Sequence, residues 1–113
     1  VASNDSLENN TEKIKKFLRA SQKGFEFMKQ NPDEALQILL NNQNEENFPL
    51  KEEVEKQSMD ILLPLMETDT VPFLSQDAQI WQNSIDWMVK EGIISQENIV
   101  KPEDVFMNMD LTE

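Results

Sequence analysis

The stretch TEKIKKFLRASQKGFEFMKQ, residues 11–30, followed at once by Asn31-Pro32-Asp33-Glu34, decides the fold. Apolar and small residues recur in it every three or four positions, as expected for one face of a helix. The members of this stripe are Ile14, Phe17, Leu18, Ser21, Phe25 and Met28. We therefore predict a helix from about Thr11 to about Gln30, with Asn9 or Asn10 as its cap and Gly24 at a close approach of another element. The preceding residues 1–10 are predicted to be a strand end running into a loop.

The residues after Gln30 predict further helices by their end signals. Asn31 is a capping residue, Pro32 suits the first helical position, and two carboxylates favour the positive end of the helix dipole. Three further helices are predicted to start at Phe48-Pro49, at Ser75 and at Lys101-Pro102. The helix that starts at Asn31 is predicted to end in residues 41–47. The next helix is predicted to end or kink at Pro64, and the one from Ser75 to stop at Gly92. Residues 67–74 are predicted to form a loop. The buried side of the helix after Phe48-Pro49 is predicted to carry Val54, Gln57, Ser58, Ile61, Leu62 and Leu65. The apolar members of the other helices are Ala35, Leu36, Leu39 and Leu40; Ala78, Trp81, Ile85, Trp87, Met88 and Val89; and Val105, Phe106 and Met109.

Only Val1-Ala2, Val71–Leu74 and Ile93-Ile94 have strand character, and each is too short for a sheet of its own. The predicted fold class is all-α, with four to five amphipathic helices around one core. The chain has 113 residues, enough for one small domain. It begins at Val1 without a Met, so we expect it to be part of a longer protein.

Charge and composition restrict the possible functions. The net charge is -12, which disfavours nucleic acid as a partner. Residues 1–30 are an exception, with six basic and four acidic side chains. The basic residues are Lys13, Lys15, Lys16, Arg19, Lys23 and Lys29. They predict a solvated helix face paired with acidic neighbours, and the alternative is a phosphate or nucleic-acid patch.

The absence of Cys and His removes thiol and imidazole ligands and the usual nucleophile–histidine pairs. We therefore predict no catalytic residue, no metal ligand and no cofactor. Adjacent carboxylates, which could serve acid–base catalysis only in a cleft, are interpreted as helix-start and surface residues. They are Asp33-Glu34, Glu45-Glu46, Glu52-Glu53 and Glu103-Asp104. No apolar run approaches the ~20 residues that span a bilayer.

Aromatic and Met residues admit two interpretations each. Trp81 and Trp87 are interpreted mainly as packing residues, with ligand stacking as the alternative. Six Met residues are interpreted as core filling, with a partner-binding surface as the alternative. They are Met28, Met59, Met66, Met88, Met107 and Met109.

Taken in order, the landmarks of the chain resemble a known family. They are Phe17-Leu18-Arg19-Ala20, Gly24, Asn31-Pro32-Asp33-Glu34-Ala35, Gln57, Leu62-Leu63-Pro64-Leu65-Met66, Trp81, Asp86-Trp87-Met88, Glu91-Gly92-Ile93-Ile94 and Glu103-Asp104-Val105-Phe106-Met107-Asn108. This series resembles the C-terminal portion of the SsuA/THI5-like (NMT1/THI5-like) solute-binding proteins of ABC importers. Within that group, the segment from Trp81 to Ile94 is most similar to the branch for thiamine pyrimidine precursors.

The resemblance implies that residues 1–113 are one helical C-terminal segment of a two-lobed, periplasmic-binding-protein-like fold, and not an enzyme. It implies three partners: the N-terminal remainder of the same protein, a transporter permease, and a small solute bound mainly by residues outside this chain. It also implies a place outside the cytoplasm, either periplasmic or lipid-anchored at the cell surface. Ligand-binding residues within this chain stay unknown. The alternative is a free-standing, acidic helical protein-interaction module.

Overall fold

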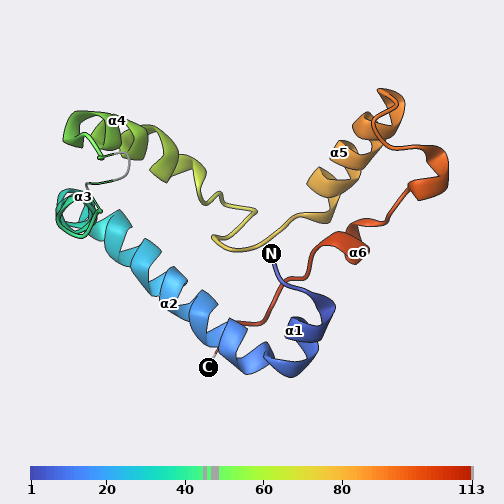
Figure 1. Cartoon of the computed structure of the whole chain (residues 1–113), viewed down its shortest axis with the longest axis horizontal. Helices are drawn as coiled ribbons and strands as arrows, with labels where there is room; N and C mark the ends of the chain where they lie inside the picture. Colours follow the sequence, from blue (N-terminus) through green and yellow to red (C-terminus); the bar gives the residue numbers. More distant parts are fainter. Residues whose placement is uncertain (45, 47–48, 113) are drawn as a thin grey trace. The chain divides into compact units, whose positions relative to one another are not determined.

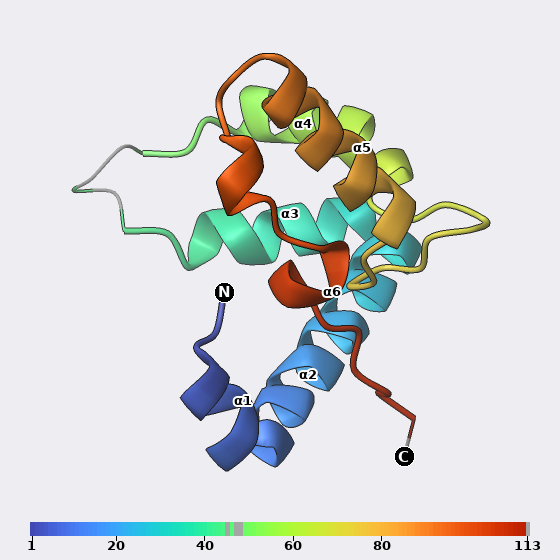
Figure 2. The same ribbon diagram turned by 90° about the vertical axis from the view of Figure 1, so that its right-hand side faces the viewer.

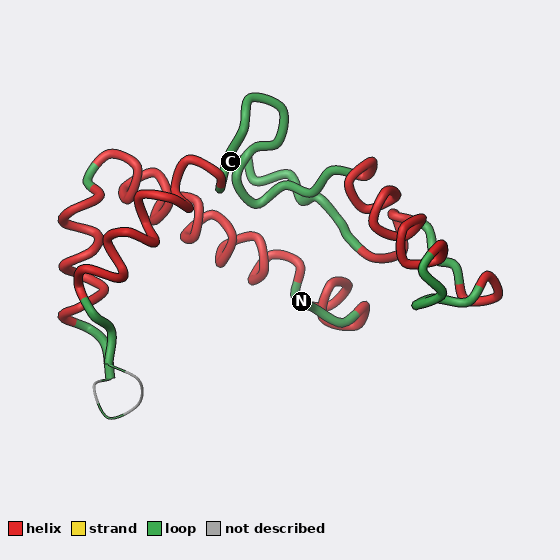
Figure 3. Tube along the Cα trace, turned by 90° about the horizontal axis from the view of Figure 1, so that it is seen from above, coloured by secondary structure: helices red, strands yellow, loops and turns green. Residues whose placement is uncertain are grey.

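The computed structural model describes residues 1–44, 46 and 49–112, and within these ranges every regular element is a helix (Figure 3). The all-α prediction is confirmed. The elements are α1 (Asn4–Asn9), α2 (Thr11–Gln30), α3 (Pro32–Asn41), α4 (Glu52–Leu62), α5 (Ala78–Lys90) and α6 (Pro102–Val105), with short 3-10 turns η1 (Leu63–Leu65) and η2 (Gln96–Asn98) (Figure 1).

The helices belong to two compact units rather than to a single cluster. Residues Val1–Phe73 form the first unit together with the end of the chain from Leu111, and Leu74–Asp110 form the second. Phe25 and Leu36 are buried in the first unit, and Ile85 in the second, so each unit has a small core of its own. The buried residues predicted as one core are thus divided between the two units.

The first unit is organised by α2, which contacts both α1 and α3, while α4 lies against α3 (Figure 2). The predicted bounds of α2 are confirmed. Its stripe is only partly buried: Phe25 is 2% exposed, whereas Phe17 is 69% exposed. Among the described residues, no other element comes within 4 Å of a Cβ built at Gly24, so the predicted close approach at this glycine was wrong.

Helix α1 replaces the strand end and loop predicted for residues 1–10, and that prediction was wrong. The Ser3 Oγ accepts a hydrogen bond from the Ser6 N–H at 3.2 Å, and Asp5 lies in the first turn. A capping hydroxyl followed by a carboxylate satisfies the free N–H groups and favours a helix start.

Asn31 separates α2 from α3 in a different way from the prediction. The start of α3 at Pro32 is confirmed, with Asp33 and Glu34 in its first turn. The Asn31 side chain makes no cap bond to α3 and instead donates from Nδ2 to the Phe27 carbonyl at 3.3 Å. Asn31 thus occupies the predicted N-cap position of α3, where its carbonyl accepts from the Ala35 N–H at 2.9 Å, but its side-chain amide closes the C-terminal end of α2 instead of capping α3.

Helix α4 begins at Glu52, later than the predicted start at Phe48-Pro49, of which Phe48 lies outside the described residues. It ends in η1 around Pro64, as predicted. Its predicted buried side was wrong, because this side is exposed in the described part of the chain. The exposed fractions are 55% for Val54, 66% for Ile61, 53% for Leu62 and 70% for Leu65.

In the second unit, the cap of α5 lies two residues later than predicted, at Asp77 rather than Ser75, and the helix begins at Ala78. The Asp77 Oδ1 accepts hydrogen bonds from the Gln79 N–H at 2.7 Å and the Ile80 N–H at 3.0 Å. The predicted stop at Gly92 is confirmed by its φ of 70° and by the bonds from the Ile93 and Gly92 N–H groups to the Met88 and Val89 carbonyls. This pair of bonds is a Schellman motif, which favours glycine at the left-handed position.

Candidate functional site

The paired carboxylates lie at helix starts and bind neighbouring groups there. Asp33 accepts a hydrogen bond from the Lys56 ammonium at 3.1 Å, and Asp104 Oδ2 accepts one from the Lys101 N–H at 3.1 Å. Both carboxylates are in the first turn of their helices. This supports their interpretation as helix-start residues; Glu45 of the pair Glu45-Glu46 lies outside the described residues. Within the described ranges, no group of three or more acidic side chains is arranged to hold a metal ion.

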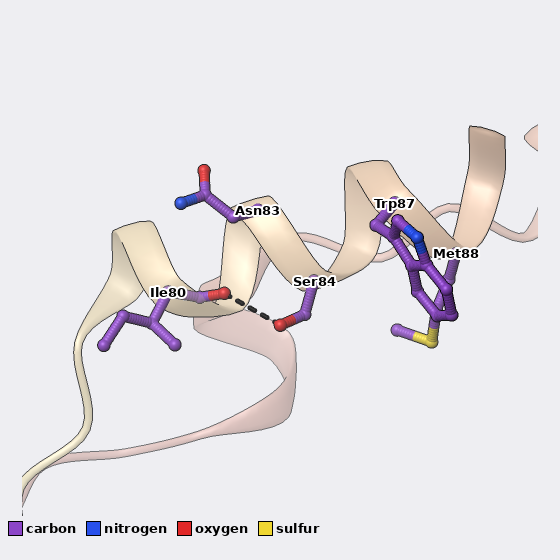
Figure 4. A pocket seen from close by; sticks show the side chains of 5 residues that line it. All are labelled: Ile80, Asn83, Ser84, Trp87 and Met88. Carbon is purple, nitrogen blue, oxygen red and sulfur yellow. Dashed lines mark hydrogen bonds between the residues drawn. The ribbon is translucent and has the colours of Figure 1, made fainter. Parts of the chain in front are cut away.

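A shallow surface depression of about 450 Å³ lies along one side of α5 and is the strongest candidate for a binding surface (Figure 4). Its lining residues are Ile80, Asn83, Ser84, Trp87 and Met88. The Ser84 hydroxyl donates to the Ile80 carbonyl at 3.0 Å, so its hydrogen-bonding capacity is directed to its own helix. The surface consists mainly of apolar atoms with one amide, which suits an apolar partner better than a charged ligand.

The two tryptophans occupy different environments. Trp81 is half-buried and stacks on Phe106, with ring centroids 6.2 Å apart and planes inclined by 15°. The packing role predicted for Trp81 is confirmed. Trp87 is 57% exposed, so the same prediction was wrong for Trp87 within this chain. The six methionines also differ in burial. Four are half-buried, two are exposed, and none is fully buried, so the predicted core filling holds for none of them.

A polar bracket holds the Trp81–Phe106 stack in place. Asn108 accepts from the Gln76 N–H and donates to the Gln76 carbonyl, both at 2.8 Å. The Gln76 side chain in turn accepts from the Trp81 Nε1–H at 3.0 Å. The bracket joins the loop before α5 to the loop after α6. Sequence reasoning missed this contact, because Gln76 and Asn108 lie 32 residues apart and the Asn108 amide bonds only to backbone groups of Gln76.

The basic residues of α2 have several partners in the first unit. Lys15 is 3.8 Å from Glu12, and Lys29 is 2.6 Å from Glu67. These pairs agree with the predicted solvated face with acidic neighbours. Arg19 is different, because it donates to the backbone carbonyls of Leu111 at 3.2 Å and Thr112 at 3.1 Å. Arg19 therefore fastens the end of the chain to α2, a role that sequence reasoning missed.

Lys29 and Glu67 form an ion pair next to the aromatic contact of the first unit. The hydrogen bond from Lys29 lowers the pKa of Glu67, helped by the bond from the Phe73 N–H, and the hydrogen bond to Glu67 raises the pKa of Lys29. The Lys29 ammonium also lies 5.2 Å from the centre of the Phe25 ring. The pair thus connects α2 to the segment that follows η1.

We expect the substitution Glu67→Gln to destabilise the chain at neutral pH but not in acid. A carboxylate whose pKa is lowered by folding stabilises the folded state above its unfolded pKa, and this contribution is lost as the pH falls through the folded pKa. The unfolding midpoint in urea, compared for both proteins across the acid range, measures the effect. Glu26→Gln is the matched control, because Glu26 contacts the same lysine at the longer distance of 3.5 Å. A difference between Glu67→Gln and the native chain that did not change with pH would contradict this assignment.

Comparisons with known proteins point to one family. The family model described as NMT1/THI5 like matches residues 1–35. A formylaminopyrimidine-binding protein of Halalkalibacterium halodurans is 45% identical over 103 residues, which cover 91% of this chain and 31% of the relative. The chain thus spans about a third of the length of this curated relative. No solved structure matches the chain.

No helix in the described part of the chain is long and apolar enough to cross a membrane.

Proposed function

Because this chain belongs to the NMT1/THI5-like family, we propose that it is the C-terminal part of the substrate-binding protein of an ABC importer. The observation that carries the proposal is the 45% identity to a solute-binding protein, sustained over 91% of the chain. Two unrelated chains that only share capped amphipathic helices would not be this similar over nearly all of a sequence. The relative is named as a binding protein, which agrees with the prediction of a non-enzymatic chain.

The proposed solute is a pyrimidine precursor of thiamine, with a formylaminopyrimidine as the first candidate. The name of the relative supports this choice. We place most of the solute site in the part of the protein outside residues 1–113, together with the docking surface for the permease. A pocket normally encloses about 70–90% of a small ligand, whereas the depression along α5 is shallow and open. By this proposal the protein works outside the cytoplasm, where an importer collects its solute.

The alternative is a free-standing acidic helical module that binds other proteins. The relative argues against it, because this chain matches only 31% of a protein about three times as long. The gene sequence upstream of Val1 distinguishes the two. An importer subunit needs an export signal and the remaining lobes ahead of this segment, whereas a module needs neither.

Titration calorimetry on the full-length protein tests the proposed solute. We expect saturable binding of a formylaminopyrimidine with one site per chain, and no comparable heat with a sulfonate or with nitrate. A pyrimidine requires stacking and amide contacts, whereas an anion requires cationic or N–H-lined pockets. Tight binding of the anions alone would replace the proposed solute. Binding of neither class would contradict the importer function, and micromolar binding to residues 1–113 alone would contradict the location of the site.

A further inference from the structure

The bracket around Gln76 closes the second unit at both of its ends. This unit runs from Leu74 to Asp110, so Gln76 and Asn108 each lie two residues inside a boundary. The Asn108 side chain binds both the N–H and the carbonyl of Gln76, each at 2.8 Å. The two ends of the unit are thus held together by bonds that lie wholly within it.

Gln76 also connects these ends to the helices between them. Its side-chain oxygen accepts from the Trp81 Nε1–H at 3.0 Å, and Trp81 stacks on Phe106 with the ring centroids 6.2 Å apart. Helix α5, which carries Trp81, contacts α6, and Phe106 directly follows α6. Because one residue binds the loops and α5 together, a break at Asn108 should be felt in α5 as well as in the loops.

The chain is fastened to the first unit just outside both boundaries. Phe73 stacks on Phe25 with the ring centroids 4.0 Å apart. The Leu111 carbonyl accepts from Arg19 Nε at 3.2 Å. All four residues belong to the first unit. Since these contacts do not involve the bracket, they can stay formed while the bracket is broken.

We propose that the second unit opens and closes separately from the first, and that the bracket is the contact that keeps it closed. Phe25 and Leu36 are buried in the first unit and Ile85 in the second, so opening of the second unit need not empty the core of the first. Proteins open in contiguous cooperative units, at a lower free energy than global unfolding requires. Release of the bracket frees the two ends of a long segment, and the entropy of the freed segment favours the open state.

Hydrogen exchange of the full-length protein, followed by mass spectrometry, tests the role of the bracket. Asn108→Ala removes both bonds to the Gln76 backbone. We expect the amides of α5 to exchange roughly 10-fold faster in this variant, because two hydrogen bonds no longer oppose opening. The amides of α2 should change by less than about 2-fold, since the first unit stays closed.

Asn98→Ala is the matched control within the same unit. Asn98 Nδ2 donates to the Ser95 Oγ at 2.9 Å, a contact between residues three apart that does not join the ends of the unit. Its loss should leave the exchange of α5 unchanged. If Asn108→Ala does not fold, Asn108→Asp keeps an acceptor for the Gln76 N–H and removes the donor to the Gln76 carbonyl, and the acceleration should again be restricted to the second unit.

Three results would overturn the proposal. Equal acceleration in α2 and α5 would show that the two units open together. Acceleration confined to the residues beside Gln76 and Asn108 would make the bracket a local contact. No difference between Asn108→Ala and Asn98→Ala would show that the bracket does not control opening. Acceleration of α5 without α2 supports the proposal, and it would do so even if calorimetry found no solute binding.

Discussion

Replacing Phe25 by Ala is expected to lower the free energy of unfolding of the chain by about 3–5 kcal/mol. The Phe25 ring is 2% exposed and stacks on Phe73 with the ring centroids 4.0 Å apart. Truncation removes this stack and leaves a cavity between α2 and the segment after η1. It also removes the ring below the Lys29 ammonium, 5.2 Å away. Urea unfolding followed by circular dichroism at the helix band measures the loss.

Phe17→Ala is the matched control for this prediction. It removes the same side chain from the same helix, but Phe17 is 69% exposed, so the expected change is within about 0.5 kcal/mol. Equal losses for the two variants would show that Phe25 has no special place in the core. If Phe25→Ala does not fold at all, Phe25→Leu keeps an apolar side chain at the site and should fold with an intermediate loss.

The helix starts and ends that depend on local chemistry were predictable from the sequence. The bounds of α2, the start of α3 at Pro32 and the stop at Gly92 follow from residues within a turn of each position. The Schellman motif at Gly92 uses only backbone groups and one left-handed glycine. The errors occur where several capping residues compete. Ser75 and Asp77 are both good caps, and Asp77 is the one that accepts two N–H groups.

Burial was less predictable than helix position, and α4 shows why. A stripe such as Val54, Ile61 and Leu65 indicates which side of a helix is apolar, but not what covers it. In the described part of the chain that side is exposed. The residues predicted to share one core are divided between the two units, with Phe25 and Leu36 buried in the first and Ile85 in the second.

Tertiary polar contacts were the least predictable class. Arg19 was interpreted as part of a basic helix face, and its bonds to the Leu111 and Thr112 carbonyls depend on where the end of the chain lies. The same holds for the bracket between Gln76 and Asn108. Such contacts join residues far apart in sequence through groups that are common on any surface. The family resemblance, in contrast, depends on the order of many weak landmarks and was recognisable without any of these contacts.

Replacing Trp81 by Ala is expected to cost the second unit about 3 kcal/mol or more. The substitution removes the stack on Phe106, whose ring centroid is 6.2 Å away, and the donor that binds the Gln76 side chain at 3.0 Å. The backbone of the same residue, Gln76, is bonded to the Asn108 side chain, so the loop before α5 and the loop after α6 should also loosen. Urea unfolding by circular dichroism measures the loss, and hydrogen exchange of the Gln76 amide reports the bracket directly.

Trp87→Ala is the matched control for this prediction. The Trp87 side chain is 57% exposed, so we expect a loss below about 1 kcal/mol. The partners of Trp81, Phe106 and Gln76, both belong to the second unit. A loss for Trp81→Ala as small as that for Trp87→Ala would contradict the core assigned to the second unit.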